Sequence, residues 1–200
     1  MFVRWCYIVL LFTVATANDG SRTAISLLRS GGVVGAVTFT ETTEGVRVSG
    51  RIVGMAPGLY GFHVHELGDT TTCDAAGPHF NPTGDEHAGR QHEFRHVGDL
   101  GNIQFEADRQ AELNFVDSVI SLRGPNNILG RTLVLHAQQD DLGQGGNPLS
   151  ATTGNAGPRV ACGVIGIYGD DAAWNSAVSI SPSLLLFILF ATGIFYFSKI

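Results

Sequence analysis

Between residues 61 and 99 the chain reads GFHVHELGDTTTCDAAGPHFNPTGDEHAGRQHEFRHVGD, and this stretch holds six of the chain's seven histidines. The seventh, His136, stands alone downstream. Neutral imidazole and carboxylate are usual ligands of zinc and copper, so a histidine cluster that ends in an aspartate predicts a metal site. We interpret the rest of the 200-residue chain as the scaffold that positions this stretch.

The spacing of the histidines predicts two sets of metal ligands. His63 and His65 are two residues apart on a predicted strand, where side chains at i and i+2 point to the same face, so both rings can reach one ion. His136 ends another predicted strand and could complete that set, whereas His92 is expected to be a solvated loop residue. Three nitrogens and one oxygen from one loop make the closed tetrahedral set that zinc prefers in structural sites, and they come from His79, His87, His96 and Asp99.

The composition indicates a turn-rich β protein, because twenty-six glycines stand among many Val, Ile, Thr and Phe residues. Residues 46–52 alternate apolar and polar side chains, as a strand with one solvent-facing side does. Short strands separated by turns predict an antiparallel sandwich or barrel. Two connections, after residue 65 and at 140–158, are too long to be simple links and are expected to be functional. Strands are expected at residues 23–28, 35–41, 46–52, 59–65, 102–107, 112–116, 131–136 and 159–168.

Residues 1–17 have the features of a secretory signal peptide. Arg4 gives a positive start, residues 7–14 are apolar, and the sequence ATA at 15–17 fits the small-x-small rule for cleavage. Cleavage would leave one domain at residues 18–169.

The predicted mature domain has two cysteines, Cys73 and Cys162, because Cys6 lies in the signal peptide. An even pair in an oxidising compartment predicts one disulfide. Closing so long a loop would stabilise the fold by roughly 4 kcal/mol in the loop-entropy description.

Residues 170–200 are predicted to be a spacer followed by a hydrophobic membrane anchor. Small residues gather at 171–177, an apolar run covers 184–197, and Lys199 follows. This order is typical of a glycosylphosphatidylinositol (GPI) signal, which is removed, and it also fits a single membrane span. The polar residues before the apolar run favour the GPI signal, and either reading places the domain on the extracellular face of the plasma membrane.

The charge argues against a nucleic-acid partner. The formal net charge is −6, and the only lysine is Lys199 in the tail. No basic patch is visible in the sequence that could bind a polyanion.

Five motifs in order give the sequence a family resemblance: GFHVHE at 61–66, GPHFNP at 77–82, RHVGDLG at 95–101, GRTLVLH at 130–136 and GNAGPRVACG at 154–163. Together they resemble copper/zinc superoxide dismutase over about residues 23–167. The resemblance implies an all-β, eight-stranded antiparallel Greek-key barrel with two long functional loops. It also implies an oxidoreductase that converts superoxide to dioxygen and hydrogen peroxide by cycling copper, with a structural zinc ion, in a homodimer.

The resemblance assigns roles residue by residue. His79 would bridge the two metals and act in catalysis, and Arg159 would receive the anion. Asp140 would accept hydrogen bonds from one ligand of each metal, His63 and His87, and Cys73 would pair with Cys162. The implied copper ligands are His63, His65, His79 and His136, and the implied zinc ligands are His79, His87, His96 and Asp99.

The sequence departs from the family where charged residues usually steer the substrate. Pro148, Leu149 and Thr152 occupy these positions and are uncharged. We therefore expect a slower enzyme whose rate depends weakly on ionic strength. Leu67 lies where the dimer contact of the family forms.

Two other functions were weighed against the enzyme. One is a non-catalytic module of the same fold, used for surface adhesion or metal binding. The other is a copper chaperone, which would need a further metal-binding domain or a C-x-C tail, and neither is present in the sequence. Because all the implied ligands, Asp140, Arg159 and both cysteines are present, the enzyme is favoured.

Overall fold

The computed structural model describes residues 21–169 and 173–174, and its strands lie in one compact unit, Ser21–Asp170. The predicted signal peptide at 1–17, with Cys6, lies outside the described residues, as does nearly all of the predicted spacer and anchor at 170–200. Across the described ranges, no helix has both the length and the apolar character needed to cross a bilayer.

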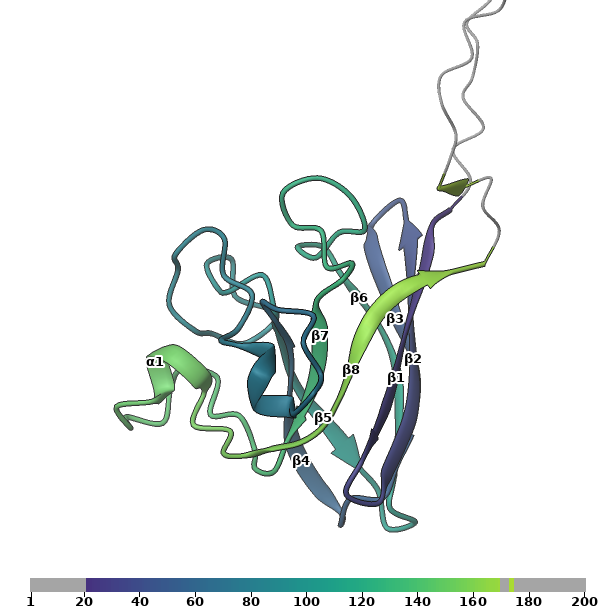
Figure 1. Ribbon diagram of the computed structural model, residues 1–200. Helices are drawn as coiled ribbons and strands as arrows, with labels where there is room; N and C mark the ends of the chain where they lie inside the picture. The colour runs from purple at the N-terminus through teal and green to yellow at the C-terminus, as the bar shows by residue number, and fades with distance from the viewer. Residues whose placement is uncertain (1–20, 170–172, 175–200) are drawn as a thin grey trace, which may run out of the picture. The chain divides into compact units, whose positions relative to one another are not determined.

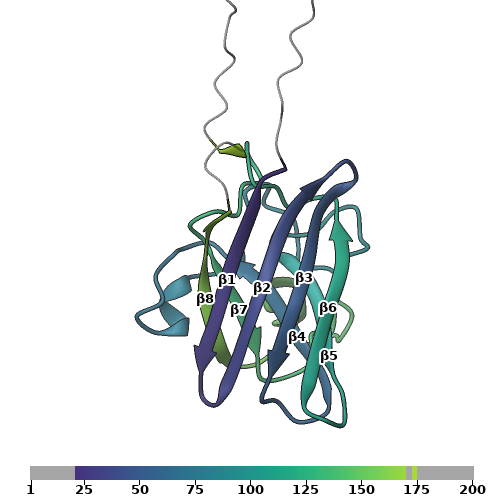
Figure 2. The same cartoon turned by 90° about the vertical axis from the view of Figure 1, so that its right-hand side faces the viewer.

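The described residues form eight strands that pair antiparallel in the order β5-β4-β7-β8-β1-β2-β3-β6. Figure 2 shows β1, β2, β3 and β6 side by side, with the other strands of the unit beside and behind them. Strands at the two ends of the order, β5 and β6, approach each other and nearly close the sheet into a barrel. The prediction of an all-β fold with eight antiparallel strands is therefore confirmed. The strands are β1 Thr23–Ser30, β2 Val33–Thr42, β3 Gly45–Val53, β4 Gly58–His65, β5 Asp99–Phe105, β6 Gln110–Asp117, β7 Thr132–His136 and β8 Arg159–Tyr168.

The core is made by side chains that alternate along these strands. In β3, Val46, Val48 and Ile52 are buried while Arg51 is exposed, as the alternating pattern of 46–52 predicts. β7 is buried along its whole length, since it lies between β4 and β8 in the middle of the order. Aromatic and aliphatic side chains that are fully buried include Phe39, Phe62, Phe105, Leu133 and Ile165.

Seven of the eight predicted strands agree with the structure to within two residues at each end. The prediction of a strand at 102–107 is wrong at its start, because β5 begins at Asp99. A register shift in β4 between Gly61 and His63 lets His63 pair with Asp99, which extends the strand back to the aspartate. The strand ends at Phe105 because the chain turns there, with Arg109 in the left-handed conformation at φ 63°.

Two long loops bring distant parts of the sequence together. The loop between β4 and β5 contains a short 3-10 helix, η1 Cys73–Ala76, and the loop between β7 and β8 contains one helical turn, α1 Ser150–Thr153. Both project on the same side of the sheet (Figure 1). The backbone N–H of His87 in the first loop donates to the carbonyl of Ala151 in the second at 2.9 Å. This contact places the ligand-bearing segments of both loops side by side.

Candidate metal centre

Two clusters of buried ligand atoms meet at His79. In each cluster the candidate ligand atoms lie within 4.8 Å of one another. β4 supplies His63 and His65, β7 ends at His136, and a short β-bridge to His65 holds His79 in the loop. The first cluster is His63, His65, His79 and His136, and the second is His79, His87, His96 and Asp99.

In the first cluster, three histidines each have one ring nitrogen committed to a hydrogen bond. His63 Nε2 donates to Asp140 Oδ2 at 2.9 Å, His65 Nδ1 to the Gly77 carbonyl at 2.8 Å, and His136 Nδ1 to the Gly157 carbonyl at 3.0 Å. A neutral imidazole has one N–H, so the other nitrogen of each ring carries a lone pair. Two of these lone-pair atoms, the Nε2 atoms of His65 and His136, lie 3.3 Å apart. Facing lone pairs at that distance fit a cation bound between them.

In the second cluster, three ring nitrogens surround one carboxylate oxygen. Asp99 Oδ1 lies 2.8 Å from His79 Nδ1, 3.0 Å from His87 Nδ1 and 3.2 Å from His96 Nδ1. The other carboxylate oxygen, Oδ2, accepts from the backbone N–H groups of Ala88 and His96 at 3.2 and 3.0 Å. The carboxylate is therefore oriented by the backbone, and three nitrogens and one oxygen converge as zinc requires.

Unpartnered atoms show that the donor set fits metal ions. His63 Nδ1, His79 Nε2 and His87 Nδ1 are buried and have no hydrogen-bond partner among the described residues. Leaving a buried polar atom unsatisfied costs about 1–3 kcal/mol. Imidazole suits both copper and zinc, and coordination would satisfy all three atoms. His79 is suited to both clusters, because its Nδ1 faces Asp99 and its Nε2 is the unpartnered atom.

Asp140 joins the two clusters through one carboxylate. Its Oδ1 accepts from His87 Nε2 at 2.8 Å, and its Oδ2 accepts from His63 Nε2. His63, His87 and Asp140 also lie close enough to form a third potential ligand group. We interpret this group as hydrogen-bonded support for the two clusters, because a carboxylate that accepts from a ligand's second nitrogen fixes the tautomer and the ring orientation.

Burial keeps the rings of the first cluster neutral, which is the ligand form. Desolvation lowers the pKa of His63 well below its ordinary value and does the same for His65, with the nearby His79 ring adding to both shifts. Desolvation also lowers the pKa of His136 to about 4. These three rings are therefore uncharged at neutral pH and ready to coordinate.

The second cluster has the opposite electrostatics. Burial alone would lower the pKa of His87, but hydrogen bonds to Asp140 and Asp99 outweigh it and raise that pKa to about 9. Burial alone would raise the pKa values of Asp99 and Asp140, yet hydrogen bonds from the histidine rings hold both well below the ordinary range. Both carboxylates are thus charged at neutral pH, and an ion that binds His87 must displace a proton.

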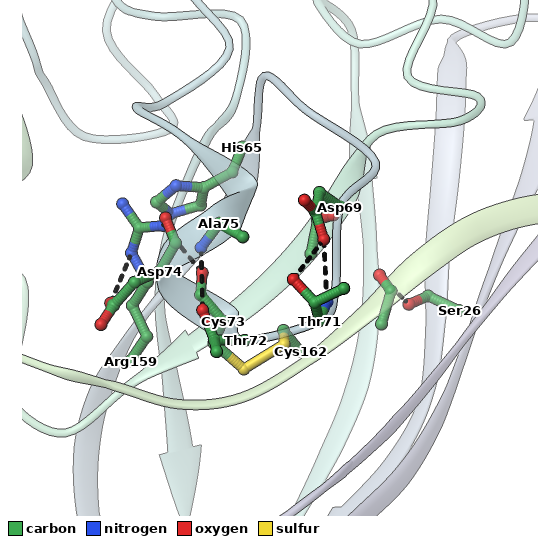
Figure 3. The surroundings of a disulfide bond; sticks show 12 residues. Ser26, His65, Asp69, Thr71, Thr72, Cys73, Asp74, Ala75, Arg159 and Cys162 are labelled. Carbon is green, nitrogen blue, oxygen red and sulfur yellow. Dashed lines mark hydrogen bonds and ion pairs between the residues drawn. A yellow bond between two sulfur atoms is a disulfide. The ribbon is translucent and has the colours of Figure 1, made fainter.

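Arg159, at the start of β8, is held by backbone carbonyls of the η1 segment. Its Nη1 donates to the carbonyls of Cys73 and Asp74 at 2.8 and 3.1 Å, and its Nη2 to that of Gly77 at 2.6 Å. The disulfide between Cys73 and Cys162 ties this segment to the same strand, and Arg159 lies beside His65 (Figure 3). Its positive charge contributes to the lowered pKa values of His65 and His136. An anion that approached the first cluster would therefore meet this guanidinium.

The other residues singled out in the sequence lie outside the clusters. His92 is exposed, and its Nδ1 donates to the carbonyl of Phe94 at 2.7 Å. Pro148, Leu149 and Thr152 are exposed around α1, so no charge replaces those that the family usually carries there.

The sequence analysis missed two residues that support the centre. Arg95 Nη1 donates to the carbonyls of His96, Val97 and Asp99, and its Nη2 forms a buried ion pair with Asp117 at 2.6 Å. Its position next to His96 was the only available signal. Asn102 binds the backbone of Asp140, and nothing in the sequence pattern marks it.

The fold and the centre define a class: an all-β barrel protein with two adjoining metal-ligand sets that share one imidazole. The profile of the family described as copper/zinc superoxide dismutase (SODC) matches residues 33–165, and the chain belongs to that family. It is also similar to a solved structure titled "Crystal Structure Analysis of the clock protein EA4", with 46% sequence identity and a TM-score of 0.72. That match covers 79% of this chain and 100% of the other.

Proposed function

We propose that the protein is a superoxide dismutase that uses copper in the first cluster and zinc in the second. The observation that carries the proposal is the position of His79, whose two ring nitrogens each belong to a different ligand set. His63, His65, His79 and His136 would hold copper, and His79, His87, His96 and Asp99 would hold zinc. Bound copper supplies reversible one-electron transfer, while zinc, which has no redox chemistry, supplies a fixed charge.

The residues of the chain then have defined tasks in the reaction. The Arg159 guanidinium, fixed by its three carbonyl partners, binds the superoxide anion beside the copper ligands. His79 Nε2 holds a proton and donates it to the peroxide product, while His79 Nδ1 stays on the zinc side. His65 and His136 keep their orientation through hydrogen bonds to backbone carbonyls. Overall, two superoxide anions and two protons give one dioxygen and one hydrogen peroxide.

The decisive experiment measures metal content and superoxide loss in the same preparation. We expect one copper and one zinc ion per chain in the wild type. His136→Ala should lose copper, retain zinc and lose at least 100-fold in activity, because a ligand of only the first set is removed. Normal activity in this variant would refute the site assignment.

A non-catalytic role is the alternative, and the solved structure supplies its motive, since that similar protein is titled a clock protein. Uncharged residues at 148, 149 and 152 also remove the usual steering charges. If the wild type binds both metals but does not accelerate superoxide loss, the metal-binding or adhesion module is the better description.

We also propose that the protein acts as a homodimer on the extracellular face of the plasma membrane. The sequence features of residues 1–17 and 170–200 support secretion and anchoring. Release of activity from intact cells by a phosphatidylinositol-specific phospholipase would establish the GPI anchor, and retention would favour a span. Exposed apolar side chains of Leu27, Leu67 and Val164 support the dimer, with 50%, 49% and 40% of their surface exposed.

A further inference from the structure

Asn102, on β5, clamps the backbone of Asp140 from both sides. Its Nδ2 donates to the Asp140 carbonyl oxygen at 2.8 Å, and its Oδ1 accepts from the Asp140 N–H at 2.8 Å. Every backbone N–H and C=O that leaves water needs a partner, and here one side chain satisfies both groups of a single residue. The pair of bonds fixes both the position and the direction of that backbone unit.

The clamped residue lies where no strand holds it. Asp140 is four residues beyond the end of β7, in the long loop that leads to β8. Its neighbour Asp141 is held only by a bond from its N–H to the carbonyl of Gly154, in the same loop. Asn102 is therefore the link between this turn of the loop and the barrel wall.

The position of this backbone matters because of the carboxylate that it carries. Asp140 accepts from His63 Nε2 at 2.9 Å and from His87 Nε2 at 2.8 Å, so it orients one ring of each ligand set. A carboxylate can fix ring orientation only if its own backbone is fixed. β5 also carries Asp99, three residues before Asn102, so one strand holds the zinc-side carboxylate directly and the linking carboxylate through the amide.

We propose that Asn102 is a positioning residue for both metal sets, acting through Asp140 on His63 and His87. The proposal rests on the metal assignment of the proposed function. It predicts that removing the amide leaves all ligands in place but loosens the rings that Asp140 orients.

The test compares Asn102→Ala with the wild type in the full-length protein, with three measurements that do not depend on activity. Zinc affinity, measured by competition with a chelator, should fall about tenfold, the lower end of what loss of a ligand-supporting partner costs. The electron paramagnetic resonance spectrum of bound Cu(II) should change. In the metal-free protein, the ring N–H resonances of His63 and His87 should shift or broaden.

Two further variants keep the result interpretable. Asn102→Asp keeps the size of the side chain and the acceptor for the Asp140 N–H, but it turns an oxygen toward the Asp140 carbonyl, so we expect a loss at least as large. Gln104→Ala is the matched control: Gln104 lies two residues along the same strand, and its amide donates to the Phe105 backbone carbonyl at 2.8 Å. It should leave all three measurements unchanged.

The outcomes separate cleanly. Wild-type zinc affinity, copper spectrum and histidine resonances in Asn102→Ala would overturn the proposal. Equal losses in Asn102→Ala and Gln104→Ala would also overturn it, because the effect would then be general weakening of β5. A wild type that binds both metals without dismutase activity would contradict the proposed function and not the positioning role.

Discussion

Arg159 and His65 donate hydrogen bonds to the same oxygen atom, the backbone carbonyl of Gly77, at 2.6 and 2.8 Å. The proposed anion-binding side chain and a proposed copper ligand are thus held relative to each other by one atom. Gly77 directly follows η1, whose first residue, Cys73, is bonded to Cys162 on the strand that carries Arg159. The disulfide, the guanidinium and the imidazole therefore form one connected support (Figure 3).

Arg159→Lys should lower kcat/KM about tenfold with no loss of copper or zinc. A lysine ammonium keeps the charge, but it cannot reproduce the planar fork that reaches three carbonyls and still faces an anion. Stopped-flow measurement of superoxide decay, with metal content determined on the same sample, checks this. A variant with normal kcat/KM would show that the fixed geometry of the guanidinium does not matter.

Replacing the disulfide, as in Cys73→Ser, should destabilise the protein and disturb Arg159 together. The bond closes a loop with a sequence separation of 89, so the loop-entropy description gives a loss of about 4 kcal/mol in the free energy of unfolding. Because η1 supplies carbonyls to Arg159, kcat/KM should also fall at temperatures where the variant is fully folded. Denaturant unfolding and activity at low temperature separate the two effects. A stability loss with unchanged kcat/KM would uncouple the disulfide from the anion site.

Much of the centre could be predicted because its ligands are side chains with distinctive chemistry. The i, i+2 pair His63 and His65 on a strand needs only local geometry, and the structure places both in one cluster. The position of the alternating strand β3 follows from burial alone. The start of β5 did not follow, because its pairing with β4 depends on a bulge that no local pattern reveals.

The supporting contacts could not be predicted, and the reason is physical. Gly77 acts through a carbonyl oxygen that every residue possesses, so its identity carries no signal for the bonds from Arg159 and His65. Asn102 recognises the backbone of Asp140 across 38 residues of sequence. Only tertiary structure brings such partners together.

The metal-free protein should be most stable near pH 6.5 and lose stability on both sides of it, so far as the centre controls it. His136 has a folded pKa of about 4 against an ordinary 6.5, so its contribution is complete above pH 6.5 and is lost as the pH falls toward 4. At about 1.4 kcal/mol per pKa unit, this amounts to about 3 kcal/mol, and the lowered pKa values of His63 and His65 act in the same direction.

His87 opposes these rings on the alkaline side. Its pKa is raised to about 9, so its contribution is complete below pH 6.5 and is lost as the pH rises through 9. Urea unfolding of chelator-treated protein from pH 4 to 9 measures the profile. His87→Gln should remove the alkaline loss while retaining the acid one. A wild-type stability that rises steadily to pH 9 would contradict the proton on His87.

Val164→Glu should convert the proposed dimer to a monomer. Val164 on β8 and Leu27 on β1 are exposed apolar side chains that line one groove beside the disulfide. A carboxylate buried in an apolar interface would be left without a partner, which costs several kcal/mol. Sedimentation analysis should give half the wild-type mass with unchanged zinc content. The matched control is Val34→Glu, since Val34 on β2 is 52% exposed and does not line that groove. Wild-type mass in Val164→Glu would exclude this surface as the interface.

The rate of superoxide loss should depend only weakly on ionic strength. Steering requires charges near the entrance that attract the anion over several ångströms, and their effect falls as salt shortens the Debye length, which is about 10 Å at 0.1 M. In this chain Leu149 and Thr152, at α1, are exposed and uncharged, so little of the rate can be screened away. Thr152→Lys should therefore raise kcat/KM at low salt and give it a steep decline with added salt. Thr152→Gln, similar in length but uncharged, should leave the salt dependence flat. If the wild type already slows steeply with salt, attraction must come from charges elsewhere, and Arg159 would be the first to substitute.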